Sequence, residues 1–147
     1  MVKLHMICSL LSYAAFLVAF ITGVLFLLQE RQLKRKTIGV LCHRLPSLEA
    51  LDRLNFLAIG VGFALLSLGL LAGFVELRLF IGQWWVADPK VYLAVVLWMV
   101  YLAVWFMRLR STLRGRRIAL LSIIGFTLVV FTMLEVSHWM RAAHPSL

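Results

Sequence analysis

Four long apolar stretches alternate with short polar and basic segments along this chain. Each stretch is free of Asp, Glu, Lys and Arg, and each is close to or above the roughly 20 residues that cross the hydrocarbon core of a bilayer. The two shorter stretches lie at the lower end of that range, where flanking tryptophans and arginines can complete the span. The pattern predicts four transmembrane helices at about residues 6–28, 54–75, 91–107 and 118–136.

The composition agrees with this pattern. Hydrophobic residues make up 63% of the 147 positions, and the mean hydropathy is +0.99, which is too apolar for a soluble domain of this length. The net charge of +9 does not indicate a nucleic-acid-binding protein, because the basic residues flank the apolar stretches. We therefore predict an all-α integral membrane protein, with residues 1–147 forming a single transmembrane domain.

The distribution of Lys and Arg predicts the orientation. Eleven of these residues lie in the segments 29–53 and 108–117, and four lie in the rest of the chain. By the positive-inside rule, these two loops are cytoplasmic, while both termini and the tryptophan-rich loop 76–90 are external. The first apolar stretch is too long for a cleaved signal peptide, so we expect a retained helix. The predicted location is the bacterial inner membrane, with the external face in the periplasm.

Local signals mark helix ends and helix packing. Ser47 is placed to cap a short amphipathic helix that leads into the second span. Asp88 followed by Pro89 is a favourable start for the third span. Gly69 and Gly73 form a GxxxG pair, which we interpret as a site where two helices pack closely.

The motifs of common enzymes are missing from this sequence. Cys8 and Cys42 are predicted near opposite faces of the membrane, so they cannot form a disulfide within one chain. The sequence contains no CxxCH, Walker, GxGxxG or HExxH motif and no recognisable nucleophile–base pair. We expect the chain on its own to handle a ligand and not to catalyse a reaction.

The predicted topology gathers histidines and aromatic residues on the external face. His5 lies at the start of the first helix, and His138 and His144 follow the end of the last one. The tryptophans have a simple explanation as interfacial belt residues, Asp88 as a helix cap and Lys90 as a snorkelling cation. The aromatic and charged residues at the same level are Trp84, Trp85, Asp88, Lys90 and Trp139.

The same residues also suit haem. Two neutral imidazoles can ligate the haem iron axially, aromatic rings can stack on the porphyrin, and a cation can neutralise a propionate. Glu135 lies three residues before His138 and is placed to orient its ring. His43 is alone on the cytoplasmic side, and we interpret it as a solvated loop residue.

Three stretches resemble the haem-handling cytochrome c assembly membrane proteins of the CcsA/ResC type, with HemX- and YpjD-like relatives. "HMICSLLSYAAF" looks like the family's segment in which an external histidine, here His5, precedes a Ser-Tyr-Ala-Ala helix. "LPSLEALDRLNF" is similar to its cytoplasmic entry into the next span. "GQWWVADPKV", followed later by "RGRRIALLSIIGF", looks like its external tryptophan motif, although Ala87 and Val91 replace an expected tryptophan and glutamate.

The resemblance covers nearly the whole chain, but only the C-terminal half of a typical family member. It implies that haem b is held transiently on the external face between the tryptophan motif and two axial histidines. These are His5 and His144, with His138 as the competitor of His144. It further implies delivery of haem to apocytochrome c together with a second assembly subunit in the lipid bilayer.

Two other function classes stay open from the sequence. A HemX-like accessory or regulatory membrane protein would act through partner contacts, and its external histidines would be dispensable. A b-type haem subunit of an electron-transfer complex would place its histidines within the spans, whereas here they lie at the helix ends.

Overall fold

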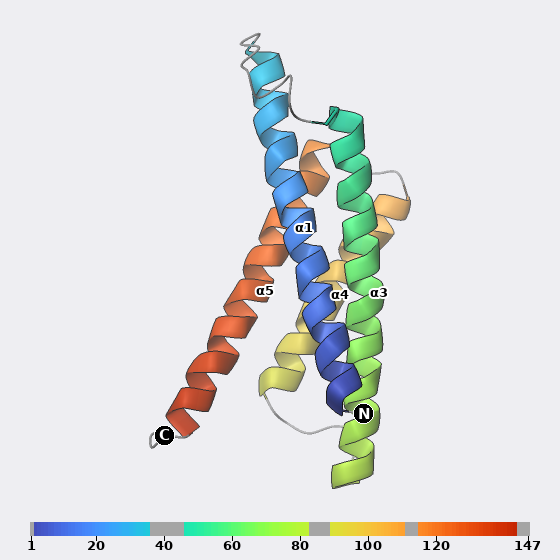
Figure 1. Cartoon of the computed structure of the whole chain (residues 1–147), viewed down its shortest axis with the longest axis vertical. Helices are drawn as coiled ribbons and strands as arrows, with labels where there is room; N and C mark the ends of the chain where they lie inside the picture. Colours follow the sequence, from blue (N-terminus) through green and yellow to red (C-terminus); the bar gives the residue numbers. More distant parts are fainter. Residues whose placement is uncertain (1, 36–45, 83–88, 111–114, 144–147) are drawn as a thin grey trace.

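The computed structural model is a bundle of long α-helices (Figure 1). It describes residues 2–35, 46–82, 89–110 and 115–143. In chain order the helices of this part are α1 (Val2–Lys34), α3 (Leu48–Ile81), α4 (Pro89–Leu109) and α5 (Arg116–Ala143). All four are long and apolar enough to cross a membrane, which confirms the predicted all-helical fold with four membrane-spanning helices.

The helices extend beyond the predicted spans. α1 has 33 residues and α3 has 34, about 50 Å each at 1.5 Å per residue, against a hydrocarbon core of about 30 Å. The predicted loops 29–53, 76–90 and 108–117 are therefore shorter, because their first and last residues are helical. An absence of charge marks only the part of a helix inside hydrocarbon. Hydrogen bonding within the helix continues into the polar interface, where charged side chains are solvated.

The ends of α3 carry the expected capping groups. The Ser47 hydroxyl accepts a hydrogen bond from the Ala50 backbone N–H at 3.2 Å. The helix predicted after Ser47 is continuous with the second span. At the other end Gly82 has φ 75°, the left-handed conformation that favours glycine, and its N–H donates to the Arg78 carbonyl at 3.1 Å. α4 begins at Pro89 as predicted, and Asp88 lies outside the described residues.

The core lies in the middle of the bundle, where aromatic rings from different helices meet. Phe16 of α1 stacks on Tyr101 of α4 with 3.7 Å between the ring centroids, and both side chains are almost completely buried. Gly62 of α3 leaves room for this pair, since a Cβ there would lie 2.5 Å from the Phe16 ring. α1 and α3 lie side by side along much of their length (Figure 1).

Hydrogen bonds between buried polar side chains join three helices. Asn55 of α3 donates from Nδ2 to the Ala19 carbonyl at 2.6 Å and to the Thr22 hydroxyl at 3.2 Å, both on α1. Its Oδ1 accepts a hydrogen bond from Ser122 of α5 at 3.1 Å. These groups satisfy one another away from water, which fixes the relative positions of α1, α3 and α5.

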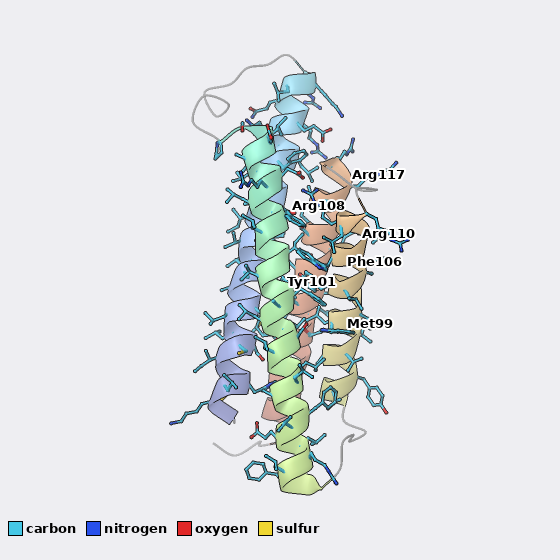
Figure 2. The ribbon with its side chains drawn as sticks, turned by 90° about the vertical axis from the view of Figure 1, so that its right-hand side faces the viewer. Met99, Tyr101, Phe106, Arg108, Arg110 and Arg117 are labelled. Carbon is cyan, nitrogen blue, oxygen red and sulfur yellow. The ribbon has the colours of Figure 1, made fainter. Side chains whose placement is uncertain are left out.

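An ion pair one helical turn before Asn55 joins α3 to α4. The Arg108 guanidinium donates to both carboxylate oxygens of Asp52, at 3.0 and 2.6 Å, and Asp52 also accepts from the Gly115 N–H at 3.4 Å. Figure 2 shows Arg108, Arg110 and Arg117 together at one end of the bundle. We call this end, which also carries Ser47, the basic end.

The opposite end carries the start of α1, the end of α3 and the start of α4, and we call it the terminal end. Here α5 diverges from α1, so that the end of α5 lies away from the start of α1 (Figure 1). Val129 is buried, but the following large side chains of α5 are exposed, among them Val130, Phe131, Met133 and Leu134. The bundle is thus tightly joined at the basic end and open at the terminal end.

Candidate functional site

A pocket of about 400 Å³ lies at the terminal end, where α1, α3 and α4 meet. This volume is within the range of ordinary small-molecule sites, and the lining is apolar except for one imidazole and one carboxylate. We call it the terminal-end pocket. Its lining residues are His5, Leu70, Gly73, Phe74, Glu76, Leu77, Phe80, Val91 and Ala94.

His5 is held at the edge of this pocket by a backbone contact. Its Nδ1 lies 2.7 Å from the Gly69 carbonyl oxygen on α3. A carbonyl only accepts hydrogen bonds, so a hydrogen bond at this distance requires the proton on Nδ1. In a neutral ring the other nitrogen, Nε2, then has a free lone pair. The external position of His5 stays a prediction, and the structure adds its hydrogen-bond partner.

Glu76 is the acidic residue of the pocket, and the sequence pattern did not predict it as a site residue. The apolar stretch ends at Val75, so Glu76 was assigned to the loop 76–90, whereas the structure places it inside α3. Gly73 lies three residues earlier, which puts both on one face of the helix. The signal that could have identified Glu76 is its position three residues after the second glycine of the GxxxG pair.

The predicted tryptophan motif belongs to the segment that joins α3 to α4, and both helices line the pocket. Trp84, Trp85 and Asp88 lie outside the described residues, and so does His144. For Lys90, His138 and Trp139 the structure gives the position on a helix but does not describe the side chain. Their roles stay predictions.

The structure does not bring the two predicted histidine-bearing ends together. The end of α5, which carries His138, diverges from the start of α1, which carries His5 (Figure 1). In the described part of the chain no three His, Cys, Asp or Glu side chains gather into a metal site. The described residues therefore offer one imidazole beside an apolar pocket.

This arrangement suits a largely apolar ligand with a metal ion that can take a nitrogen from the protein. Haem meets that description, since its macrocycle already supplies four ligands to the iron and the protein adds the axial ones. His5 presents a nitrogen with a free lone pair, while Phe74 and Phe80 supply aromatic rings to the lining.

The fold defines a multi-pass membrane protein with a histidine-bearing pocket at one end. A family model described as "Cytochrome C assembly protein" matches residues 1–144, and the chain belongs to this family.

Relatives that resemble the chain are cytochrome c biogenesis proteins CcsA. The protein of Prochlorococcus marinus strain MIT 9215 is 32% identical over 153 residues, which cover 91% of this chain and 50% of that protein. The protein of strain MIT 9312 is 42% identical over 89 residues, covering 60% and 29%. The protein of Porphyra purpurea is 34% identical over 101 residues, covering 69% and 32%. No solved structure matches the chain.

The chain spans about half the length of the relatives that it matches. This agrees with the resemblance to half of a typical family member. The activity of a whole CcsA protein is therefore only proposed for this chain.

Proposed function

We propose that this chain binds haem b transiently in the terminal-end pocket, on the external face of the membrane, for delivery to apocytochrome c. The observation that carries the proposal is the His5 imidazole, held by the Gly69 carbonyl beside a largely apolar pocket of about 400 Å³. Membership of the cytochrome c assembly family supports it independently.

The proposed sidedness rests on the charges. Arg108, Arg110 and Arg117 gather at the basic end (Figure 2), which the positive-inside rule assigns to the cytoplasm. The pocket at the terminal end then opens to the external side, which in the bacterial inner membrane is the periplasm. On this side a bound haem is accessible to an apocytochrome without crossing the bilayer again.

Each residue has a defined role in the proposal. His5 would hold the haem iron through Nε2. A second histidine, His144 or His138, stays a prediction, because the end of α5 diverges from the start of α1 (Figure 1). Trp84, Trp85 and Asp88, with Lys90 and Trp139, would contribute an aromatic platform and polar contacts to the haem. Bound haem supplies an iron that accepts axial ligands. The protein positions this group, shields it from water with the apolar lining and releases it to the acceptor, together with a second assembly subunit.

A HemX-like accessory role is the second candidate. The specific observation in its favour is that α5 diverges at the terminal end and exposes large apolar side chains there. Such a protein would act through its partners. A variant lacking His5, His138 and His144 would then restore cytochrome c assembly as well as the wild type does, whereas haem presentation requires that it fail.

Filling the pocket tests the site without touching its histidine. Ala94→Trp places an indole in the lining, and we expect it to weaken haem binding at least about ten-fold, or about 1.4 kcal/mol. The measurement is a haem titration of the detergent-solubilised protein followed by its absorption spectrum.

Val96→Trp is the matched control for this prediction. Val96 lies on the same helix, is 58% exposed and does not line the pocket, so its variant should bind like the wild type. Equal affinities for the two tryptophan variants would place the haem elsewhere.

A further inference from the structure

We propose that Gly69 and Gly73 form a seat for the His5 imidazole that selects its tautomer. The seat places the proton on Nδ1 and leaves Nε2 as the nitrogen that binds a ligand. The identity of that ligand as haem iron rests on the proposed function, but the tautomer itself does not.

The first part of the seat is the Gly69 carbonyl. Within α3 this oxygen accepts the ordinary helical hydrogen bond from the N–H of residue 73. A carbonyl oxygen has two lone pairs, so it can accept a second bond from outside the helix. The His5 Nδ1 lies 2.7 Å away and takes this position.

The second part of the seat is the missing side chain of Gly73. A Cβ at this position would lie 3.1 Å from the His5 Nδ1 and 3.3 Å from its Cε1. These distances are shorter than ordinary van der Waals contacts, so the ring would have to shift by a few tenths of an ångström. Glycine thus leaves the approach to the Gly69 carbonyl open.

Gly69 has a different role in the same GxxxG pair. The nearest side-chain atoms to a Cβ there would be Ser9 Oγ at 3.2 Å and Cys8 Cβ at 3.5 Å. Gly69 therefore lets α1 pack close to α3, and Gly73 accommodates the ring one turn later. The GxxxG pattern predicted only close packing of two helices. The structure adds that Gly73 leaves room for the His5 ring.

The chemistry follows from the hydrogen bond. In water the neutral imidazole favours the proton on Nε2, which would block that nitrogen as a ligand. A carbonyl that accepts from Nδ1 favours the other tautomer, orients the ring and makes Nε2 more basic. Metal-ligating histidines commonly use this device. Because His5 also lines the terminal-end pocket, the seat prepares it as a ligand before any haem arrives.

The tautomer is measured on the ligand-free protein by nitrogen NMR with ¹⁵N-labelled histidine in detergent. The His5 signals are assigned by their loss in His5→Ala. We expect the wild type to show a protonated Nδ1 and an unprotonated Nε2. The proposal is overturned if the proton is found on Nε2. This measurement requires neither bound haem nor a folded glycine variant.

A variant of Gly73 and a control variant on the same helix give a matched comparison. Gly73→Ala should weaken the tautomer preference and bind haem up to about ten-fold more weakly, because the added methyl group displaces the ring by a few tenths of an ångström from the Gly69 carbonyl. Leu71→Ala, at an exposed position of α3 outside the pocket lining, should keep both the tautomer and the affinity. The proposal is also overturned if a folded Gly73→Ala protein shows the same His5 tautomer preference as the wild type.

The haem titration separates this proposal from the function on which it rests. If the wild type binds haem and Gly73→Ala binds it equally well, the seat has no role in ligation, but the proposed function survives. If the wild type binds no haem while its Nδ1 is protonated, the proposed function fails and the seat stands.

Discussion

Replacing His5 with alanine is expected to weaken haem binding more than about 100-fold. Losing a partner behind a metal ligand already costs about 10- to 100-fold, and this change removes the ligand itself. His5 is the only histidine whose side chain the structure describes, and it lines the pocket. The affinity is measured by titrating haem into the purified protein and following its main absorption band.

Two controls accompany this prediction. His43→Ala removes a histidine predicted on the cytoplasmic side and should bind haem like the wild type. Added imidazole should restore the absorption spectrum of His5→Ala, because a free ring can enter the space that the side chain leaves. A His5→Ala protein with wild-type affinity would show that the axial nitrogen comes from another residue.

The second large effect concerns stability. Asp52→Ala should lower the free energy of unfolding by about 3 kcal/mol, because it leaves the Arg108 guanidinium without its carboxylate. The Arg108 side chain is only 9% exposed, and both of its short contacts are to Asp52. The Gly115 N–H loses an acceptor in the same variant. Thermal or denaturant unfolding in detergent measures the change.

The matched control is another acidic residue in an ion pair. Glu30 bonds Lys34 at 2.8 Å, but the Lys34 side chain is 66% exposed, so Glu30→Ala should cost under about 0.5 kcal/mol. Replacing both Asp52 and Arg108 with leucine should recover most of the stability, since no buried charge is then left unpaired. Equal losses for Asp52→Ala and Glu30→Ala would contradict the account.

Much of the fold could be predicted because it depends on local patterns. Charge-free stretches identified the four helices, and Ser47 and Pro89 marked two of their starts. The helix lengths could not be predicted from the same signal, because α3 continues through Glu76 to Ile81 although charge appears. A stretch without charged residues marks the part of a helix that contacts hydrocarbon. The helix itself ends at its capping residue, which is Gly82 for α3.

The site was predictable in part. The spacing of His5 from the first span placed it at the end of the bundle where the structure has the pocket. Its contact with Gly69 could not be predicted, because the two residues are 64 positions apart and meet only through the packing of α1 on α3. Glu76 was not predicted as a pocket residue, because the charge-free stretch ends at Val75 and does not show that the helix continues past it. The roles of the tryptophan motif and of the second histidine stay predictions.

The most direct test of the central claim combines sidedness with occupancy of the pocket. In a background without Cys8 and Cys42, single cysteines are introduced by Phe80→Cys in the pocket lining and by Ser47→Cys at the basic end. Both positions are exposed and lie at opposite ends of α3. We expect a membrane-impermeant maleimide to label Phe80→Cys in intact cells, and haem added outside to protect it. Ser47→Cys should react only after permeabilisation. Labelling of Phe80→Cys only in permeabilised cells, or labelling that haem does not change, would contradict an external haem site.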